Sequence, residues 1–119
     1  MRILHLTLKK KWFDMILSGE KKEEYREIKK HWAVRLINPM CLCTWGDKVE
    51  IYKSDVFYTF KGFDVVKFTN GYAANAPSLL IECKGIEIGT AKPEWSDNWQ
   101  GEVFKIKLGE ILEYPTVPF

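Results

Sequence analysis

Two kinds of hydrophobic spacing follow one another at the start of the chain. From Ile3 to Leu8 two sets of side chains alternate, one of them all leucine, which predicts a β-strand. From Lys9 to Ser18 apolar residues recur three and four positions apart, which predicts an amphipathic helix that Gly19 is suited to end. Three lysines occupy the first turn of this helix, although the helix dipole disfavours cations there.

The charged segment 21–28 that follows is predicted as a second strand, because Gly19 has already ended the helix. Lysine, glutamate and arginine are good helix formers, so a helix stays open as the alternative. On a strand, Glu24 and Arg26 share a face because side chains repeat every two residues, whereas Lys21 has the opposite parity. Lys21 therefore joins them only if it lies at the entry of the strand, outside its regular alternation.

The rest of the chain predicts one more helix and mostly strands. Residues 29–36 are expected to form a short amphipathic helix, with Trp32 and Leu36 on one face. A loop that holds Cys41, Cys43 and Trp45 is expected next, and segment 54–61 is left unassigned. Further strands are expected at 48–52, 63–69, 78–88 and 102–108, with long loops at 70–77 and 92–101. This order predicts an α+β, mainly β fold, a closed or nearly closed antiparallel sheet with helices at its ends.

Composition narrows the class of protein. A chain of 119 residues fits one domain, expected to span 1–119, and 46% hydrophobic residues are enough for a folded core. The net charge is only +2, so any contact with nucleic acid must come from local clusters. The N-terminus lacks the layout of a signal peptide, and no apolar run approaches the roughly 18 residues of a membrane helix. No membrane partner is therefore expected. The number of cysteines, three, is odd, so a framework of disulfides is not indicated and a cytoplasmic location is expected.

The cysteines do not predict a metal site. Cys41 and Cys43 form a C-x-C pair, and His31 and Cys83 are the other candidate zinc ligands, but a second paired set of ligands is missing. There is also no glycine-rich loop of the kind that cradles phosphates. No metal and no cofactor are expected.

Three charged residues carry the main chemical hypothesis. Arg26 offers a planar fork to a phosphate or a base edge, Lys21 a point charge, and Glu24 an acceptor or proton-transfer group. The alternative is that all three are solvated charges that pair weakly on a sheet surface.

Gly19, Lys21, Glu24 and Arg26 follow a strand and a helix and fill the pattern G-x-K-x-x-E-x-R. In this order, segment 6–26 resembles the opening of the ASCH domains (activating signal cointegrator homology), members of the PUA-like superfamily. The resemblance implies a small, mostly antiparallel PUA-like β-barrel with a cleft, lined by this motif, that receives RNA or a nucleotide. Lys21, Glu24 and Arg26 are the ligand-binding residues that it implies.

The same resemblance implies a catalytic alternative. Some bacterial relatives hydrolyse N4-acetylcytidine with the motif lysine as nucleophile or base, which gives that role to Lys21 and an assisting role to Glu24. That group carries threonine where this chain has Glu24, and its later glutamate has three candidate counterparts here. These are Glu82, Glu87 and Glu94. A ribonuclease ranks lower, because the chain has no histidine pair of the kind that often performs such chemistry.

Basic and aromatic residues around the motif are secondary candidates for RNA binding. The lysines at 9–11 and a second basic group, Lys29, Lys30, His31 and Arg35, are expected to border the cleft and contact phosphates. Tyr72 and Trp95 lie in predicted loops, where rings are hard to bury and bases can stack on them. The alternatives are solvated helix faces for the lysines and core packing for the rings. From these groups, Lys9, Lys10, Lys29, Tyr72 and Trp95 complete the predicted binding site.

Overall fold

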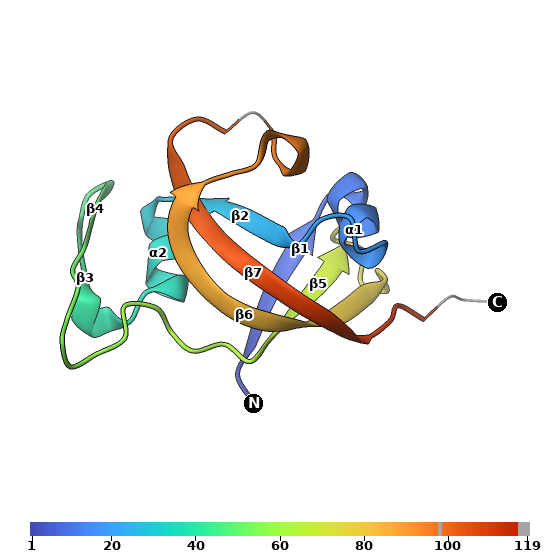
Figure 1. Ribbon diagram of the computed structural model, residues 1–119, viewed down its shortest axis with the longest axis horizontal. Coiled ribbons are helices and arrows are strands. Elements are labelled where there is room, and N and C mark those ends of the chain that lie inside the picture. Colours follow the sequence, from blue (N-terminus) through green and yellow to red (C-terminus); the bar gives the residue numbers. More distant parts are fainter. Residues whose placement is uncertain (98, 117–119) are drawn as a thin grey trace. The chain divides into compact units, whose positions relative to one another are not determined.

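The computed structural model describes residues 1–97 and 99–116, and it confirms the predicted α+β, mainly β class (Figure 1). Within these two ranges, two α-helices and two short 3₁₀ helices accompany the strands. The strands are β1 (Ile3–Leu8), β2 (Glu23–Glu27), β3 (Leu42–Trp45), β4 (Lys48–Ile51), β5 (Val65–Asn70), β6 (Ser78–Thr90) and β7 (Glu102–Glu113). The helices are α1 (Lys10–Leu17), α2 (Lys30–Leu36), and the 3₁₀ turns η1 (Pro39–Cys41) and η2 (Pro93–Trp95).

Five strands form one mixed sheet in the order β1-β5-β6-β7-β2, while β3 and β4 pair separately. Strand β5 pairs in parallel with β1, so that Leu4 lies opposite Val66 and Leu6 opposite Phe68, and it pairs antiparallel with β6. The pair of β1 and β5 is therefore a parallel pair in a fold that the sequence predicts as mostly antiparallel. A parallel pair needs a long connection between its strands, and here the chain between β1 and β5 contains both helices and three other strands.

The chain divides into two compact units. The first contains residues 1–24, 63–85 and those from 106 onward, and the second contains residues 25–62 and 86–105. Both units are discontinuous in sequence because the chain leaves each and returns to it. The single domain expected from length stays a prediction.

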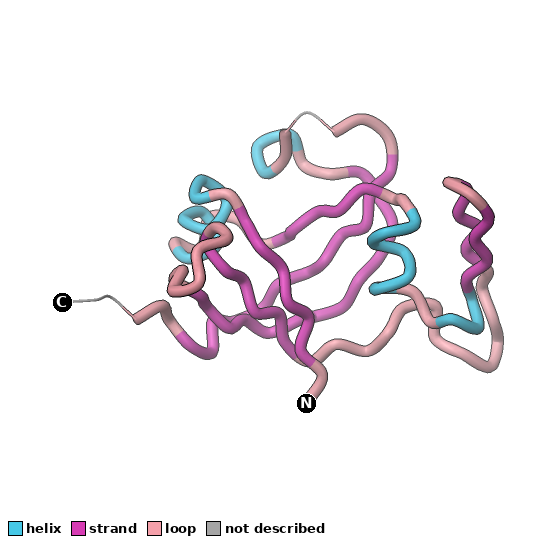
Figure 2. Tube along the Cα trace, turned by 180° about the vertical axis from the view of Figure 1, so that it is seen from behind, coloured by secondary structure: helices cyan, strands magenta, loops and turns pink. Residues whose placement is uncertain are grey.

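The core of the first unit follows from the alternation in β1. Its three leucines are buried, and β5 buries Val66 and Phe68 beside them. Helix α1 lies beside β1 and β5 (Figure 2). The helix buries its apolar face of Trp12, Phe13 and Ile16. Each fully buried large side chain of this kind contributes about 1.5–3 kcal/mol to folding.

The second unit has an aromatic core. Tyr25, Ala91 and Val103 are buried together, and Trp95 and Trp99 pack against them while half-buried. The backbone N–H of Lys92 donates a hydrogen bond to the Tyr25 hydroxyl over 3.2 Å, which anchors the loop that follows β6.

Several elements differ from their predicted form. The helix alternative for segment 21–28 is wrong, because β2 occupies Glu23–Glu27. The expected loop around Cys43 is strand β3, which pairs with β4 across a turn where Gly46 has a φ of 58°. Strand β7 continues to Glu113, five residues past the predicted end at 108. The predicted end is too early because the apolar alternation of this strand weakens after Leu108.

Candidate functional site

The end of helix α1 sets the position of Lys21. Gly19 follows the helix with a φ of 84°, a backbone conformation that glycine adopts without steric cost. The chain then turns back, and the N–H of Lys21 donates to the carbonyl of Met15 over 3.0 Å. At the next residue, the Lys22 carbonyl accepts from the N–H of Leu108 in β7. Lys21 therefore precedes β2 and lies outside its alternation, as the parity argument predicts.

Lys21 and Glu24 form a buried ion pair. Their Nζ and Oε1 atoms are 3.2 Å apart, and the exposed fractions of the two side chains are 0% and 6%. They are the charged residues that are buried in the described part of the chain. The alternative of a solvated surface pair is wrong for these two residues. Burial removes both charges from water, and the free energy that this costs can exceed the attraction between them. A gain in stability is therefore not enough to explain the pair.

The indole ring of Trp12 connects this pair to helix α1. The amine of Lys21 lies 4.9 Å from the centre of the ring, and the amine of the exposed Lys11 lies 4.4 Å from it. Both distances are within the range of cation–π attraction. A ligand that contacts the Lys21 amine must displace one of these neighbours, because the lysine side chain has no exposed surface.

Strand β5 brings an exposed aromatic residue next to the basic start of α1. The N–H of Gly71 donates to the carbonyl of Leu8 over 3.0 Å, so the loop after β5 is fixed beside the residues that begin the helix. Tyr72, the next residue in that loop, is 92% exposed. Lys9, Lys10 and Lys11 are exposed as well, and Lys10 pairs with Asp14. The first unit thus presents a free aromatic face and several amines in one region.

The motif arginine belongs to the second unit. The guanidinium carbon of Arg26 lies 4.9 Å from the centre of the Trp32 ring, and its Nη1 donates to the Tyr25 carbonyl over 2.8 Å. In the same unit, Lys29 precedes α2 and lies 3.6 Å from the carboxylate of Glu27. Trp95, predicted as a stacking residue, packs against the core around Tyr25. The amine of Lys92 lies 4.4 Å from the centre of its ring, so little of the ring is open for a base to stack on.

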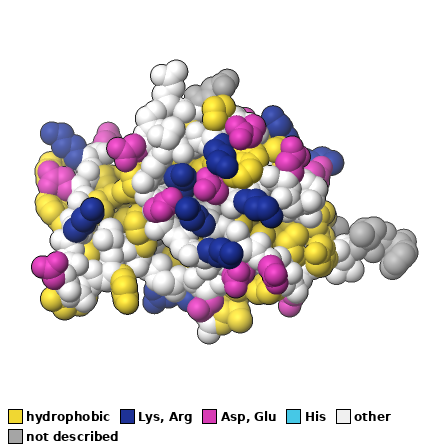
Figure 3. Space-filling view, in the orientation of Figure 1, with side chains coloured by type: hydrophobic (Ala, Val, Ile, Leu, Met, Phe, Trp, Pro, Cys, Tyr) yellow, Lys and Arg dark blue, Asp and Glu magenta, His cyan; other side chains and the backbone are white. Residues whose placement is uncertain are grey.

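Charges of both signs are mixed on the face of the molecule that Figure 3 presents. Such mixing agrees with the small net charge and gives no single-sign patch there. Any attraction for a polyanion must come from local groups such as the lysines at the start of α1.

The three glutamates that were candidates for a later catalytic role have separate surroundings. Glu82 is exposed on β6, and its carboxylate lies over Gly109, where a Cβ atom would clash with it. Within the described residues Glu82 forms no ion pair or hydrogen bond with Lys21. Glu87 pairs with Lys105 at 3.8 Å, and Glu94 is exposed in η2.

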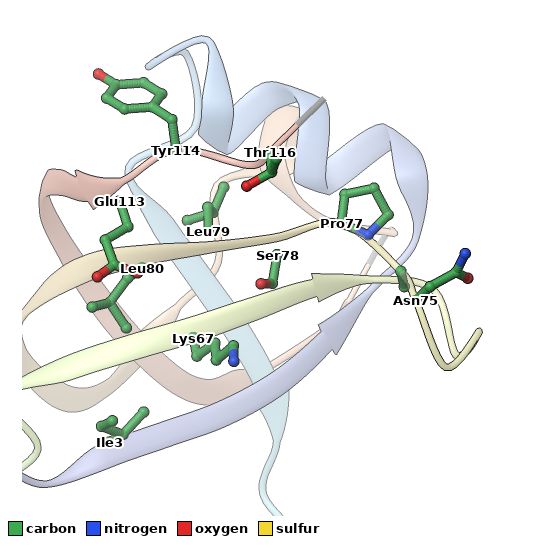
Figure 4. Close-up of a pocket in the computed structure, with 11 residues that line it drawn as sticks. Ile3, Lys67, Asn75, Pro77, Ser78, Leu79, Leu80, Glu113, Tyr114 and Thr116 are labelled. Carbon is green, nitrogen blue, oxygen red and sulfur yellow. The ribbon is translucent and has the colours of Figure 1, made fainter. Parts of the chain in front are cut away.

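Sequence reasoning missed a cavity of about 460 Å³ in the first unit, between strands β5 and β6 and the segment that follows β7 (Figure 4). Lys67, Ser78, Leu80, Glu113 and Tyr114 are among its lining residues, and none of the predicted site residues lines it. Its volume is in the range of small-molecule sites. Nothing in the sequence marks it, because its walls come from four distant segments that carry no motif.

Titration and metal binding add little to the site. Burial raises the pKa of the Cys83 thiol above its ordinary value, and a hydrogen bond with Glu50 raises the pKa of the exposed Tyr52. Residues 1–97 and 99–116 contain no group of three or more side chains that could hold a metal ion. No helix in these ranges is long and apolar enough to cross a membrane.

We compared the chain with protein-family models, with curated proteins and with solved structures, and none of the three comparisons gives a match. The resemblance to ASCH domains therefore rests on Gly19, Lys21, Glu24 and Arg26 and stays a prediction.

Proposed function

We propose that this protein is an RNA- or nucleotide-binding module of the ASCH type. The observation that carries the proposal is the backbone hydrogen bond from Gly71 to Leu8, because it brings the loop that holds the exposed Tyr72 next to the chain segment that holds Lys9, Lys10 and Lys11. Binders of single-stranded nucleic acid combine these two components, aromatic rings on which bases stack and cations that contact the backbone.

The buried pair of Lys21 and Glu24 lies next to helix α1, which begins at the lysines of this surface. The amines of Lys21 and Lys11 both lie near the ring of Trp12 in α1, so this ring contacts the buried ion pair and one of the exposed lysines. Apolar residues of similar volume would often stabilise a fold equally well or better than a buried ion pair. The place of the pair in the motif favours a role in holding the ligand site in shape.

Binding of a labelled single-stranded RNA, followed by fluorescence anisotropy, tests the proposal. Loss of one stacked base costs about 1–3 kcal/mol, so Tyr72→Ala is expected to weaken binding about 5- to 150-fold. Lys9→Gln should reduce the slope of log K against log salt by about 0.7 if Lys9 contacts one phosphate. Tyr58→Ala is the matched control, because Tyr58 is 89% exposed and lies in the second unit. If the wild type and Tyr72→Ala bind the RNA with equal affinity, the proposal that RNA binds at this surface is wrong.

Hydrolysis of an acylated cytidine is the second candidate, and the distance between Lys21 and Glu24 favours it. At 3.2 Å, the carboxylate is within reach of proton transfer with the amine. In that reaction Glu24 accepts the proton of the Lys21 ammonium, and the free amine then takes a proton from water while the water oxygen attacks the acyl carbon. The amide C–N bond breaks as that proton passes to the exocyclic nitrogen, so that cytidine and acetate leave. Incubation with N4-acetylcytidine and chromatography for cytidine tests this activity. No turnover at high enzyme concentration would exclude it.

A further inference from the structure

The hairpin of β3 and β4 in the second unit has an outer edge formed by β4. The N–H of Tyr52 donates to the carbonyl of Cys41 over 2.7 Å, and bonded pairs alternate along an antiparallel ladder. The backbone groups of Lys48 and Glu50 therefore face β3 as well. Those of Val49, between them, point away from β3 to the outer edge.

This outer edge can accept another strand. Among residues 1–97 and 99–116, β3 is the strand that pairs with β4. A two-stranded hairpin is marginally stable by itself, and three or more strands are needed for independent stability. An exposed strand edge is also a template for the backbone of another chain. The outer edge of β4 is therefore suited to pair with a strand from outside this chain.

The charges on β4 favour a second copy of this protein as the source of that strand. Two copies of β4 that pair antiparallel around Val49 place Lys48 of each copy directly opposite Glu50 of the other. The outward N–H and carbonyl of Val49 then bond to those of Val49 in the second copy. Pairing centred on Lys48 or on Glu50 instead places like charges opposite each other, which is destabilising. The two charges thus select one register.

Both charged groups are exposed and oriented for this pairing. Lys48 forms no ion pair or hydrogen bond within the described part of the chain. The carboxylate of Glu50 accepts a hydrogen bond from the hydroxyl of Tyr52, which reduces its freedom on the exposed face of the hairpin. An opposite charge from a second copy meets an amine that needs no other partner to be displaced.

Exposed hydrophobic side chains accompany this edge. Trp45 lies opposite Lys48 on β3 and is 48% exposed. Large side chains that follow β4 are 42% to 89% exposed, namely Tyr52, Val56, Phe57 and Tyr58. Groups of exposed apolar side chains are typical of surfaces that contact another protein.

We infer that a second copy of this protein binds along the outer edge of β4, so that two hairpins form one four-stranded sheet about a two-fold axis. Both copies use the same edge, so this association stops at a dimer. Four residues on each side bury little surface, and we expect a weak dimer with a dissociation constant between about 10 µM and about 1 mM. The inference rests on the second unit alone and is independent of the proposed function.

Sedimentation equilibrium of the whole protein from about 10 µM to about 1 mM tests the inference, with the charges of β4 reversed in turn. Lys48→Glu and Glu50→Lys each place like charges opposite each other at both ends of the paired strands. Each single variant should weaken the dimer about tenfold or more. The double variant, Lys48→Glu with Glu50→Lys, has opposite charges in place again and should form the dimer as the wild type does.

A mixture of the two single variants is the sharpest arm of the experiment. Their chains match each other in charge but not themselves, so the equal mixture should dimerise where either variant alone does not. Lys53→Glu is the matched control, because it makes the same change of charge at an exposed residue of the same unit outside β4. All three positions are exposed, so the variants are expected to fold, which circular dichroism checks.

Hydrogen exchange locates the interface. The amide of Val49 should exchange more slowly at high than at low protein concentration, because it donates to the second copy in the dimer. A protein that stays monomeric over the whole range overturns the inference. So does a dimer that neither single variant weakens, a mixture that does not associate, or growth into oligomers larger than a dimer.

Discussion

Replacing Glu24 with glutamine removes one charge of the buried ion pair and keeps the size of the side chain. At 3.2 Å, and with an effective dielectric constant of 20, the attraction between the two charges is about 5 kcal/mol. Desolvation costs several kcal/mol for each ion, so the intact pair is expected to contribute little net stability. Without the carboxylate, the ammonium of Lys21 loses this partner while its side chain stays buried.

We therefore expect Glu24→Gln to lower the free energy of unfolding by about 3–5 kcal/mol. This is a large part of the roughly 5–15 kcal/mol that stabilises a typical domain. Urea unfolding followed by circular dichroism and tryptophan fluorescence measures the difference. Glu20→Gln is the matched control, because Glu20 is exposed and lies four residues away, and its expected effect is within about 0.5 kcal/mol.

A double variant completes the test. Lys21→Met with Glu24→Leu replaces the ion pair by apolar side chains and should recover most of the lost stability, since such exchanges are often neutral or stabilising. A loss of stability below about 1 kcal/mol for Glu24→Gln, equal to that of the control, would refute the reasoning, because an exposed ion pair contributes no more than this to stability.

Three other predictions concern the surroundings of the site. Gly19→Ala should cost about 1–2 kcal/mol in urea unfolding, because its φ of 84° strains any residue with a Cβ, whereas Gly62→Ala, with open space and no positive φ, should cost less or nothing. Tyr25→Phe should cost about 1 kcal/mol, because the Lys92 N–H loses its acceptor. Cys83 should react with iodoacetamide more slowly at pH 8 than glutathione does, because burial raises the pKa of its thiol. Since that pKa is higher in the folded state, its contribution to stability is present below the ordinary value of 9.0 and is lost as the pH rises through the folded value. Equal rates for Cys83 and glutathione, or equal losses for the two glycine variants, would contradict these expectations.

Local patterns in the sequence were sufficient for the elements around the site. The leucines of β1 and the spacing of Trp12, Phe13 and Ile16 in α1 predict which faces are buried, because each pattern reports a single element. Gly19 and the parity of Lys21 predict that this lysine leaves the strand's alternation, because both depend only on backbone geometry over a few residues.

Pairing between distant segments could not be predicted in the same way. The parallel register of β1 with β5 depends on a connection of more than fifty residues, and no local signal encodes it. For the same reason, neither the closeness of Tyr72 to Lys9 nor the approach of Arg26 to Trp32 was visible in the sequence. Strand β3 was missed because it is four residues long and buries no residue completely, so its alternation is weak.

A two-dimensional NMR titration of the labelled protein with a short single-stranded RNA tests the central claim most directly. We predict that the amide signals of residues 9–11, 21–26 and 71–72 shift together and saturate at one RNA concentration. Saturable shifts around Lys67, Ser78 and Tyr114 instead, with these segments unchanged, would place the ligand in the cavity between β5 and β6 and contradict the assignment.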